Sequence, residues 1–135
     1  MNPTFLSIGE VLEIHRDQIN RYGGEPGIRD LGLLQSALAM PAAGFGGRFV
    51  HGDLYEMAAA YLFHIVQNHP FVDGNKRTGV VAALVFLALN NVVIEAEEED
   101  FERVVRAAAE GQAAKATVSE FLKKHAQEGD GTHGA

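Results

Sequence analysis

Apolar residues recur along most of the chain at the three- and four-residue spacing of amphipathic helices, and no segment alternates strictly as a half-buried strand would. A helix is predicted over residues 8–22, because Ser7 and Glu10 have the spacing of a capping box and two glycines follow the last apolar position. A second, short helix is predicted between the N-cap candidate Asp30 and the helix-ending Pro41.

Two further helices are predicted on either side of a polar interruption. Asp53 and Glu56 repeat the capping spacing before a broad apolar stripe, which predicts a helix over residues 54–68. This helix should end at His69, because Pro70 disfavours the α conformation of the residue before it. The following run RTGVVAALVFLALN is apolar nearly all round, which is typical of a helix buried on most sides.

The remaining segments give weaker patterns. Residues 42–52 contain four glycines and no sustained period, which predicts a loop or a small flap. The acidic run at residues 97–100 suits the start of a fifth helix, which Gly111 would cap. Thr117 and Glu120 predict the start of a last helix.

These segments together predict an all-α fold, a compact single-domain bundle of about six helices. The domain should cover residues 1–126, and residues 127–135 are predicted to be a disordered tail. The chain of 135 residues, with 47% apolar and 21% charged residues, has the size and composition of one folded globular domain.

Charge and composition narrow the classes of function. A formal charge of −7 argues against nucleic acid as a direct partner, because phosphate binding needs a surplus of basic residues on one face. The absence of cysteine excludes disulfides and fits a reducing compartment. The start of the chain lacks the pattern of a secretion signal, and the longest apolar stretch, residues 79–89, is too short to span a bilayer. We therefore expect a cytoplasmic protein with no membrane partner.

Polar residues with chemical potential concentrate in HPFVDGNKRT, residues 69–78, between the two apolar segments. The start of the second segment should expose unpaired N–H groups and the positive end of a helix macrodipole. Gly74 would let a ligand approach the backbone closely, Asn75 can hydrogen-bond, and Lys76 and Arg77 add two positive charges. This pattern predicts a binding site for a phosphate chain.

A carboxylate beside such a site implies a cation between the two negative groups. Asp73 is placed to hold Mg²⁺, which takes one or two protein carboxylates and leaves its other positions to phosphates and water. His69 can act as a general base, because its unperturbed pKa lies near neutrality. Phe71 should point into the core and anchor the loop. The set favours phosphoryl transfer from a nucleoside triphosphate.

The same residues allow other interpretations. The segment is not a Walker loop, because the pattern G-x-x-x-x-G-K is absent. His69 and Asp73 could bind zinc from one helical face, but Pro70 and Gly74 make a continuous helix there unfavourable. The bland alternative is a polar loop that merely joins two helices.

Several polar residues outside this segment could have either a structural or a functional role. His64 is expected to be packed or half-exposed on its helix rather than to serve as a second base. His51 could belong to a flap that aligns a protein substrate, or could be an ordinary exposed loop residue. Arg29 and Asp30 are expected to form a turn and a helix cap, with a functional role as the alternative.

The segment HPFVDGNKR resembles the H-x-F-x-(D/E)-(A/G)-N-(G/K)-R motif of Fic/Doc proteins. The lysine at position 76 is similar to the form of the motif in the death-on-curing (Doc) branch. GGEPGIRDLGLLQSALAMP and YEMAAAYLFHIVQNHPFVDGNKRTGVVAALVFL also resemble Doc sequences, so the similarity covers at least residues 22–92. The resemblance implies a compact helical fold that binds ATP and Mg²⁺ at the motif. It also implies a role for each motif residue: general base His69, Mg²⁺ ligand Asp73, anion-binding loop Gly74 and Asn75, and phosphate-gripping Lys76 and Arg77.

Two positions distinguish the branches of this family. Fic enzymes have glycine in the place of Lys76 and a second arginine where this chain has Val80. Fic enzymes transfer AMP, whereas Doc toxins transfer the γ-phosphate to a threonine of elongation factor Tu and block translation. The resemblance therefore implies a Doc-type toxin of a toxin-antitoxin system, an ATP-dependent kinase of a serine or threonine hydroxyl. The alternatives are a Fic-type adenylyltransferase and a non-catalytic nucleotide-binding module.

Regulation is also implied by the resemblance. Self-inhibited Fic proteins carry an (S/T)-x-x-x-E-(G/N) helix, and this chain has no such match, because its Ser/Thr and Glu pairs are one residue too close. The resemblance implies inhibition in trans by a Phd-like antitoxin, whose C-terminal segment would dock on an apolar groove.

Overall fold

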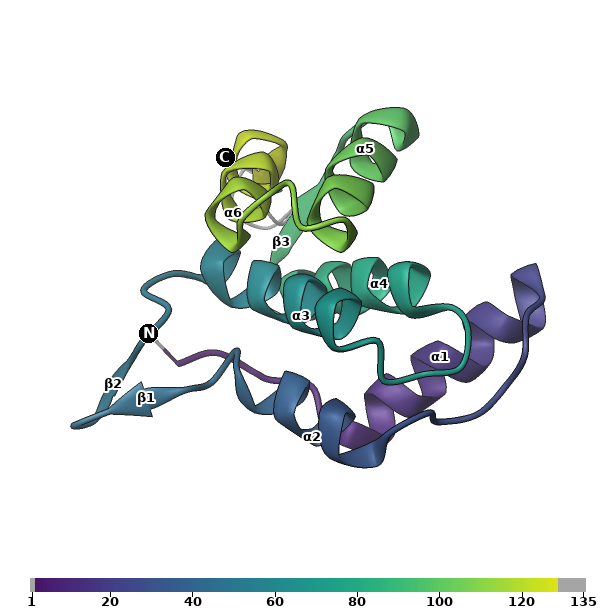
Figure 1. Cartoon of the computed structure of the whole chain (residues 1–135). Helices are drawn as coiled ribbons and strands as arrows, with labels where there is room; N and C mark the ends of the chain where they lie inside the picture. The colour runs from purple at the N-terminus through teal and green to yellow at the C-terminus, as the bar shows by residue number, and fades with distance from the viewer. Residues whose placement is uncertain (1, 129–135) are drawn as a thin grey trace.

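The computed structural model describes residues 2–128, which form six helices and four short strands (Figure 1). The all-α fold predicted from the sequence is confirmed, because the strands contain only two or three residues each. The elements are α1 (Ile8–Tyr22), α2 (Leu31–Ala39), β1 (Gly44–Phe45), β2 (Arg48–Phe49), α3 (Leu54–Asn68), α4 (Asn75–Leu89), β3 (Val92–Ile94), α5 (Glu98–Ala109), α6 (Lys115–Lys124) and β4 (Ala126–Glu128).

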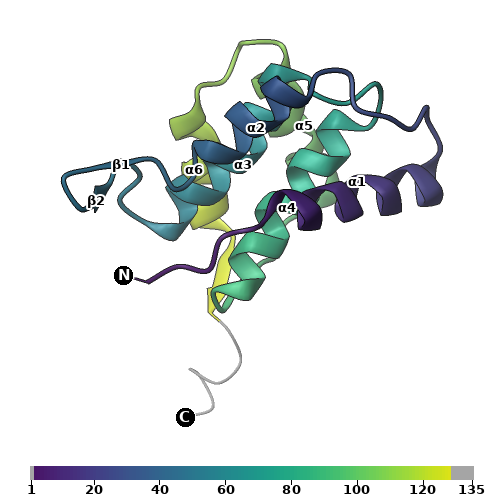
Figure 2. The same cartoon turned by 90° about the horizontal axis from the view of Figure 1, so that it is seen from below.

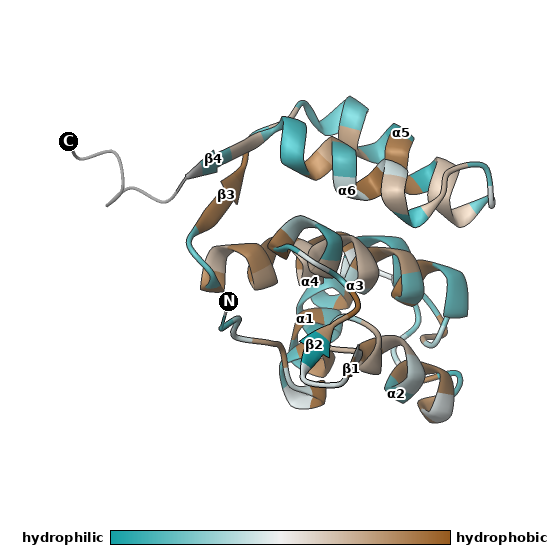
Figure 3. Ribbon diagram, turned by 90° about the vertical axis from the view of Figure 1, so that its left-hand side faces the viewer, coloured by the Kyte–Doolittle hydropathy of each residue, from teal (hydrophilic) through white to brown (hydrophobic). Residues whose placement is uncertain are grey.

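Helices α3 and α4 form the middle of the molecule. Helices α1 and α2 lie on one side of this pair and α5 and α6 on the other, as Figures 1 and 3 show. Gly79 allows the two central helices to approach closely, because a β-carbon there would lie 3.1 Å from Val66 Cγ2 and 3.2 Å from the Leu62 carbonyl oxygen. The apolar run that predicted a buried helix is therefore confirmed as α4.

Side chains cap three helices at the predicted positions. In α1, the capping box is complete: Glu10 N donates to Ser7 Oγ at 3.2 Å and Ser7 N donates to Glu10 Oε1 at 2.8 Å. Asp30 caps α2, and Asp53 caps α3, where its Oδ1 accepts from Glu56 N at 2.8 Å. These three starts were predictable because the capping residue and the capped amide lie within three positions.

The C-terminal part of the chain differs from the prediction. Helix α6 begins at Lys115, not at Thr117, and its N-cap Ala114 makes no side-chain hydrogen bond. The start is set instead by packing, because Val118 and Leu122 are fully buried.

The segment after α4 pairs with the end of the described chain. Strand β3 runs antiparallel to β4, with Val93 opposite Gln127. Residues 127 and 128 therefore belong to a strand and the tail prediction is wrong for them, while residues 129–135 lie outside the described part. Strand pairs of three residues leave no periodic signal in the sequence, because their hydrogen-bond partners are distant along the chain.

The glycine-rich stretch predicted as a loop or flap forms a small hairpin of β1 and β2. Glycine is required at Gly44, because a β-carbon there would lie 2.6 Å from the Arg48 carbonyl oxygen. Gly46 and Gly47 have φ values of 60° and 80°, as a tight two-residue hairpin turn needs. Figure 2 shows the hairpin projecting from the helices.

The hairpin lies at the start of α3, at the end opposite the motif. A helix of 15 residues is about 22 Å long, so the hairpin is well separated from His69. No helix among residues 2–128 is long and apolar enough to cross a membrane.

Candidate active site

The motif begins at the C-terminal end of α3. His69 caps this helix in the left-handed conformation, with φ 52° and ψ 52°, and its side chain is exposed. The predicted end of the helix before Pro70 is confirmed. A residue with a β-carbon pays about 1–2 kcal/mol for this conformation, so contacts elsewhere must hold it.

Arg29 supplies those contacts. Its Nε donates to the His69 carbonyl oxygen at 2.6 Å, and its Nη2 donates to the Asn68 carbonyl oxygen at 2.9 Å. These are carbonyl groups at the negative end of the α3 macrodipole, where a cation is favoured. The sequence favours a turn at Arg29, with a functional role as the alternative, and the structure shows its guanidinium bound to the backbone carbonyl group of the candidate base.

An extended segment before α2 pairs with the motif loop. Arg29 N and Asp30 N both donate to the Pro70 carbonyl oxygen, at 2.7 Å and 3.0 Å. Val72 N donates to the Gly27 carbonyl oxygen at 3.1 Å. The loop is thus fixed by backbone hydrogen bonds to a segment about 40 residues earlier.

The loop is also anchored in the core. Phe71 is fully buried, as predicted. The side chain of Asn75 accepts from Phe71 N and donates to the Phe71 carbonyl oxygen, both at 2.9 Å. The Asn75 carboxamide is therefore occupied inside the protein and not available to a ligand, so this residue can offer only its backbone N–H.

Helix α4 starts without a capping side chain. Its N-cap Gly74 is left-handed, with φ 79° and ψ 17°, and no side chain bonds to the first amides. A β-carbon on Gly74 would lie 3.2 Å from Ile19 Cδ1, so the Ile19 side chain of α1 packs closely against the backbone at the start of α4. The open N–H groups and the macrodipole make this end attractive to an anion.

Two cations follow Gly74. Lys76 is exposed. Arg77 Nη2 donates to the Gly23 carbonyl oxygen at 2.9 Å, and the guanidinium lies 5.4 Å from the centre of the Tyr22 ring. The Nε of Arg77 is buried and has no hydrogen-bond partner among the described residues, which leaves one buried donor unsatisfied.

The carboxylate of Asp73 is held on one side only. Its Oδ2 accepts from Glu25 N at 2.8 Å, and its Oδ1 accepts no hydrogen bond from residues 2–128. Within those residues there is no group of three or more His, Cys, Asp or Glu side chains that could hold a metal. A cation at Asp73 would thus take most ligands from outside the protein, which fits Mg²⁺ with phosphate and water and does not fit zinc.

All six site residues predicted from the sequence line one pocket of about 450 Å³. Its other walls were not predicted: Val66 comes from α3, and Ala109 and Glu110 come from the end of α5. No sequence signal marks these three, because their neighbourhood with the motif depends on helix packing. The full lining is Val66, His69, Asp73, Gly74, Asn75, Lys76, Arg77, Ala109 and Glu110.

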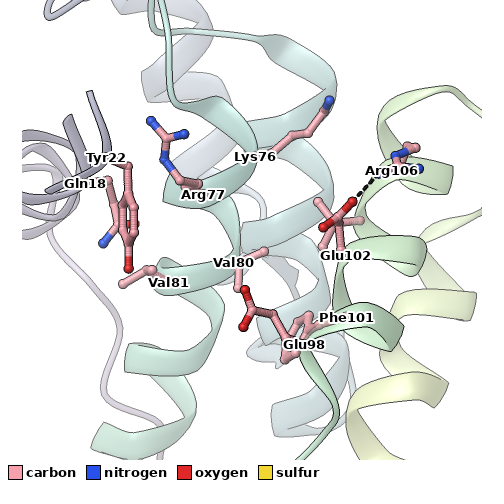
Figure 4. A pocket seen from close by; sticks show the side chains of 11 residues that line it. Gln18, Tyr22, Lys76, Arg77, Val80, Val81, Glu98, Phe101, Glu102 and Arg106 are labelled. Atoms are coloured by element: carbon pink, nitrogen blue, oxygen red, sulfur yellow. Dashed lines mark hydrogen bonds and ion pairs between the residues drawn. The ribbon is translucent and has the colours of Figure 1, made fainter. Parts of the chain in front are cut away.

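A second hollow of about 550 Å³ lies between α1, α4 and α5 (Figure 4). Lys76 and Arg77 line both this groove and the first pocket. Apolar side chains from α4 and α5 line the groove, Val80 among them, and the charged Glu98, Glu102 and Arg106 of α5 line it as well. Its apolar lining consists of Val80, Val81, Phe101 and Val105.

The other histidines singled out from the sequence do not join the site. His64 is half-buried, as predicted, and its Nε2 lies 2.9 Å from Lys115 Nζ. Burial, with the nearby charges of Lys115 and His51, lowers the pKa of His64 to about 4. His51 is only 7% exposed, so of its two alternatives the ordinary exposed loop residue is wrong, and its side chain does not line the motif pocket.

The motif also lies within the part of the chain that matches known proteins. The model of the Fic/DOC family matches residues 5–87. The chain is 45% identical over 76 residues to Toxin Doc of Mycolicibacterium smegmatis, a match that covers 56% of this chain and 58% of that toxin. It is 33% identical over 119 residues to Protein kinase doc of Escherichia phage P1, covering 88% of this chain and 93% of that protein.

Proposed function

The chain belongs to the Fic/DOC family, and we propose that it is a Doc-type toxin that transfers the γ-phosphate of ATP to a serine or threonine hydroxyl of a protein target. The observation that carries the proposal is the shared pocket, in which the exposed His69, the half-satisfied Asp73 and the uncapped start of α4 meet. A relative named a toxin and a relative named a protein kinase point in the same direction.

The start of α4 would bind the phosphate chain. Its free backbone amides, the guanidinium of Arg77 and the ammonium of Lys76 are three kinds of donor on residues that line one pocket. Hydrogen bonds from such groups to a charged phosphate are shorter and stronger than neutral ones. The volume of about 450 Å³ lies within the range of small-molecule sites.

Asp73 would hold Mg²⁺ through its free Oδ1, while Glu25 N keeps the carboxylate in place through Oδ2. The ion would neutralise phosphate charge as the β–γ bond breaks. Glu25 thus contributes through its backbone, and its side-chain chemistry is not required.

His69 would act as the general base. Its imidazole takes the proton of the acceptor hydroxyl, the hydroxyl oxygen bonds to the γ-phosphorus, and the bond from that phosphorus to the bridging oxygen of ADP breaks. Arg29 supports this step by holding the His69 carbonyl oxygen, and thereby the left-handed backbone that aims the ring. His69 remains exposed, so a protein acceptor has access to it.

The transferred group is inferred from two positions. Lys76 adds bulk and charge where Fic enzymes have glycine, and Val80 places an apolar side chain in the groove where those enzymes have arginine. An arginine there would offer a second grip on the phosphates, which favours a different alignment of the nucleotide. Transfer of AMP is the competing reaction.

The target and the inhibitor are proposed from the family. Elongation factor Tu is the proposed acceptor, which places the activity in translation and in the cytoplasm. A Phd-like antitoxin is the proposed inhibitor. The apolar groove of Figure 4 suits its docking segment, because a peptide bound there would also cover Lys76 and Arg77.

The test uses ATP labelled at either the α or the γ position, incubated with elongation factor Tu and wild type or His69→Ala. We expect γ label on a threonine of the factor and a loss of at least about a hundredfold in the variant, the usual scale for removal of a general base. Label from the α position alone would make the protein an adenylyltransferase. Binding of ATP without transfer, unchanged in His69→Ala, would make it a non-catalytic nucleotide-binding module.

A further inference from the structure

One buried histidine contacts the motif loop from a distant part of the chain. His15 lies on α1, is 6% exposed, and is separated from Asp73 by 58 positions. Its Nε2 lies 2.8 Å from the Asp73 carbonyl oxygen. Its ring stacks on Phe71, with the centroids 3.8 Å apart and the planes 7° from parallel.

The hydrogen-bond partner of His15 shows which ring nitrogen carries a proton. A carbonyl oxygen can only accept a hydrogen bond, so Nε2 of His15 carries a proton and donates it. The bonded carbonyl belongs to the peptide that joins Asp73 to Gly74. His15 therefore sets the orientation of the peptide immediately before the left-handed Gly74, which begins the anion-binding end of α4.

Asp73 is thus held at two points by the N-terminal part of the chain. His15 holds its backbone oxygen, and Glu25 N holds Oδ2. If the peptide after Asp73 rotated, the carboxylate and the first amides of α4 would change their relative direction. The carboxylate and the amides must converge on one nucleotide, so this angle matters for binding.

We propose that His15 is a positioning residue, which fixes the Asp73–Gly74 peptide so that the Asp73 carboxylate and the α4 amides face the same ligand. This inference rests on the proposed function. A purely structural role is the competing explanation, in which the ring only fills space between α1 and Phe71.

Two substitutions of His15 separate the effect of its N–H donor from the effect of its aromatic ring. His15→Gln keeps an N–H donor at a similar distance from the backbone and removes the aromatic stack. His15→Phe keeps a stacked ring and removes the donor. A positioning role depends on the donor, so we expect His15→Phe to lower kcat by about ten- to a hundredfold, the scale of small misplacements in active sites.

The same role predicts that His15→Gln keeps kcat within about threefold of wild type, even where loss of the stack lowers the melting temperature. The KM for the protein acceptor should not change in either variant, because His15 does not line the motif pocket. Activities that follow only the fraction of folded protein, with glutamine worse than phenylalanine, would overturn the proposal. If His15→Phe does not fold, His15→Asn replaces it, because its shorter amide loses both the reach and the ring.

A second readout does not need catalysis. Mn²⁺ with ATP broadens backbone amide signals close to the bound ion, and the Gly74 signal reports the peptide that His15 holds. We expect a shifted Gly74 signal and at least about tenfold weaker Mn²⁺ broadening in His15→Phe, and near wild-type behaviour in His15→Gln. Equal broadening in the three proteins would overturn the role of His15. If wild type binds Mn²⁺ and ATP but transfers no phosphate, the proposed function fails while the role of His15 is still decided by the spectra.

Discussion

The starts of α3 and α4 are built in opposite ways. At α3, the Asp53 carboxylate accepts from Glu56 N at 2.8 Å, and Glu56 adds a second acid to the first turn. Both negative charges match the positive end of the macrodipole. At α4, Gly74 offers no side chain, and the cations Lys76 and Arg77 stand where a negative charge is favoured.

The difference separates a helix start that side chains stabilise from one whose first amides are left open. The absence of a cap is not sufficient as a signal, because α6 also starts without one. At α4 the missing cap coincides with a left-handed glycine, an exposed carboxylate and two cations in one pocket. A local departure from favourable design that recurs in several residues at one place is typical of a functional site.

The largest effect should come from replacing the glycine at the start of α4. In Gly74→Ala the new β-carbon would lie 3.2 Å from Ile19 Cδ1 and the residue would keep φ near 79°. We expect a loss of about 1–2 kcal/mol in unfolding free energy and a loss of transfer of about a hundredfold. Urea unfolding and phosphate transfer measure the two effects.

Gly111→Ala is the matched control. Gly111 also has a left-handed backbone, with φ 76°, but a β-carbon there would meet nothing within 4 Å. The control should show a similar cost of about 1 kcal/mol with transfer unchanged per folded molecule. An equal loss of transfer in the two variants would contradict a functional role for the start of α4.

The next effect concerns the charge in the first turn of α4. Lys76→Gln should weaken ATP binding about tenfold, and it should leave stability unchanged or raise it by about 0.3–1 kcal/mol, because a cation opposes the macrodipole there. The control Lys124→Gln, in the last turn of α6, should lower stability by a similar amount without changing ATP binding. Calorimetric titration with ATP and thermal unfolding distinguish the two. If both substitutions lowered stability, the proposed contrast between Lys76 and Lys124 would be wrong.

The capped start should show the reverse behaviour. Asp53→Ala should cost about 1 kcal/mol of unfolding free energy, because the Glu56 amide loses its acceptor. Transfer per folded molecule should not change, since Asp53 lies at the far end of α3 from His69. Asp53→Asn, which keeps a capping oxygen, should recover most of the stability. Reduced transfer in Asp53→Ala would show that the two ends of α3 are coupled.

The smallest effect is a dependence of stability on pH that arises away from the motif. Burial lowers the pKa of His64 to about 4, below its usual value of 6.5, so the unfolded chain binds more protons between these values. Stability should therefore fall as pH decreases from about 6.5 to about 4. Burial also lowers the pKa of His51, in the same direction.

His64→Gln should flatten this dependence in part, because only the His51 contribution remains. Melting temperatures measured across this pH range provide the check. An unchanged slope in the variant would assign the acid sensitivity to other groups.

Much of the site could be found from the sequence. The motif residues His69 to Arg77 are contiguous, and each residue type has a chemical use at that place, so the predicted six meet in one pocket. The side chain of Asn75 was expected to be available for hydrogen bonding but is occupied by Phe71. At Arg29 the sequence favours a turn over a functional role, and no sequence pattern marks His15.

The sequence by itself determined the elements whose causes are local. Capping pairs such as Ser7 with Glu10 act over three positions, and the apolar periods of α3 and α4 are fixed by spacing within the helix. Only the tertiary structure decided what holds the motif in shape. The groups that hold Asp73 are the side chain of His15, 58 positions away, and the backbone N–H of Glu25, 48 positions away. Such contacts follow from the packing of α1 against α4. The Glu25 contact is made by a backbone N–H, a group that nearly every residue type has, so the sequence could not reveal it.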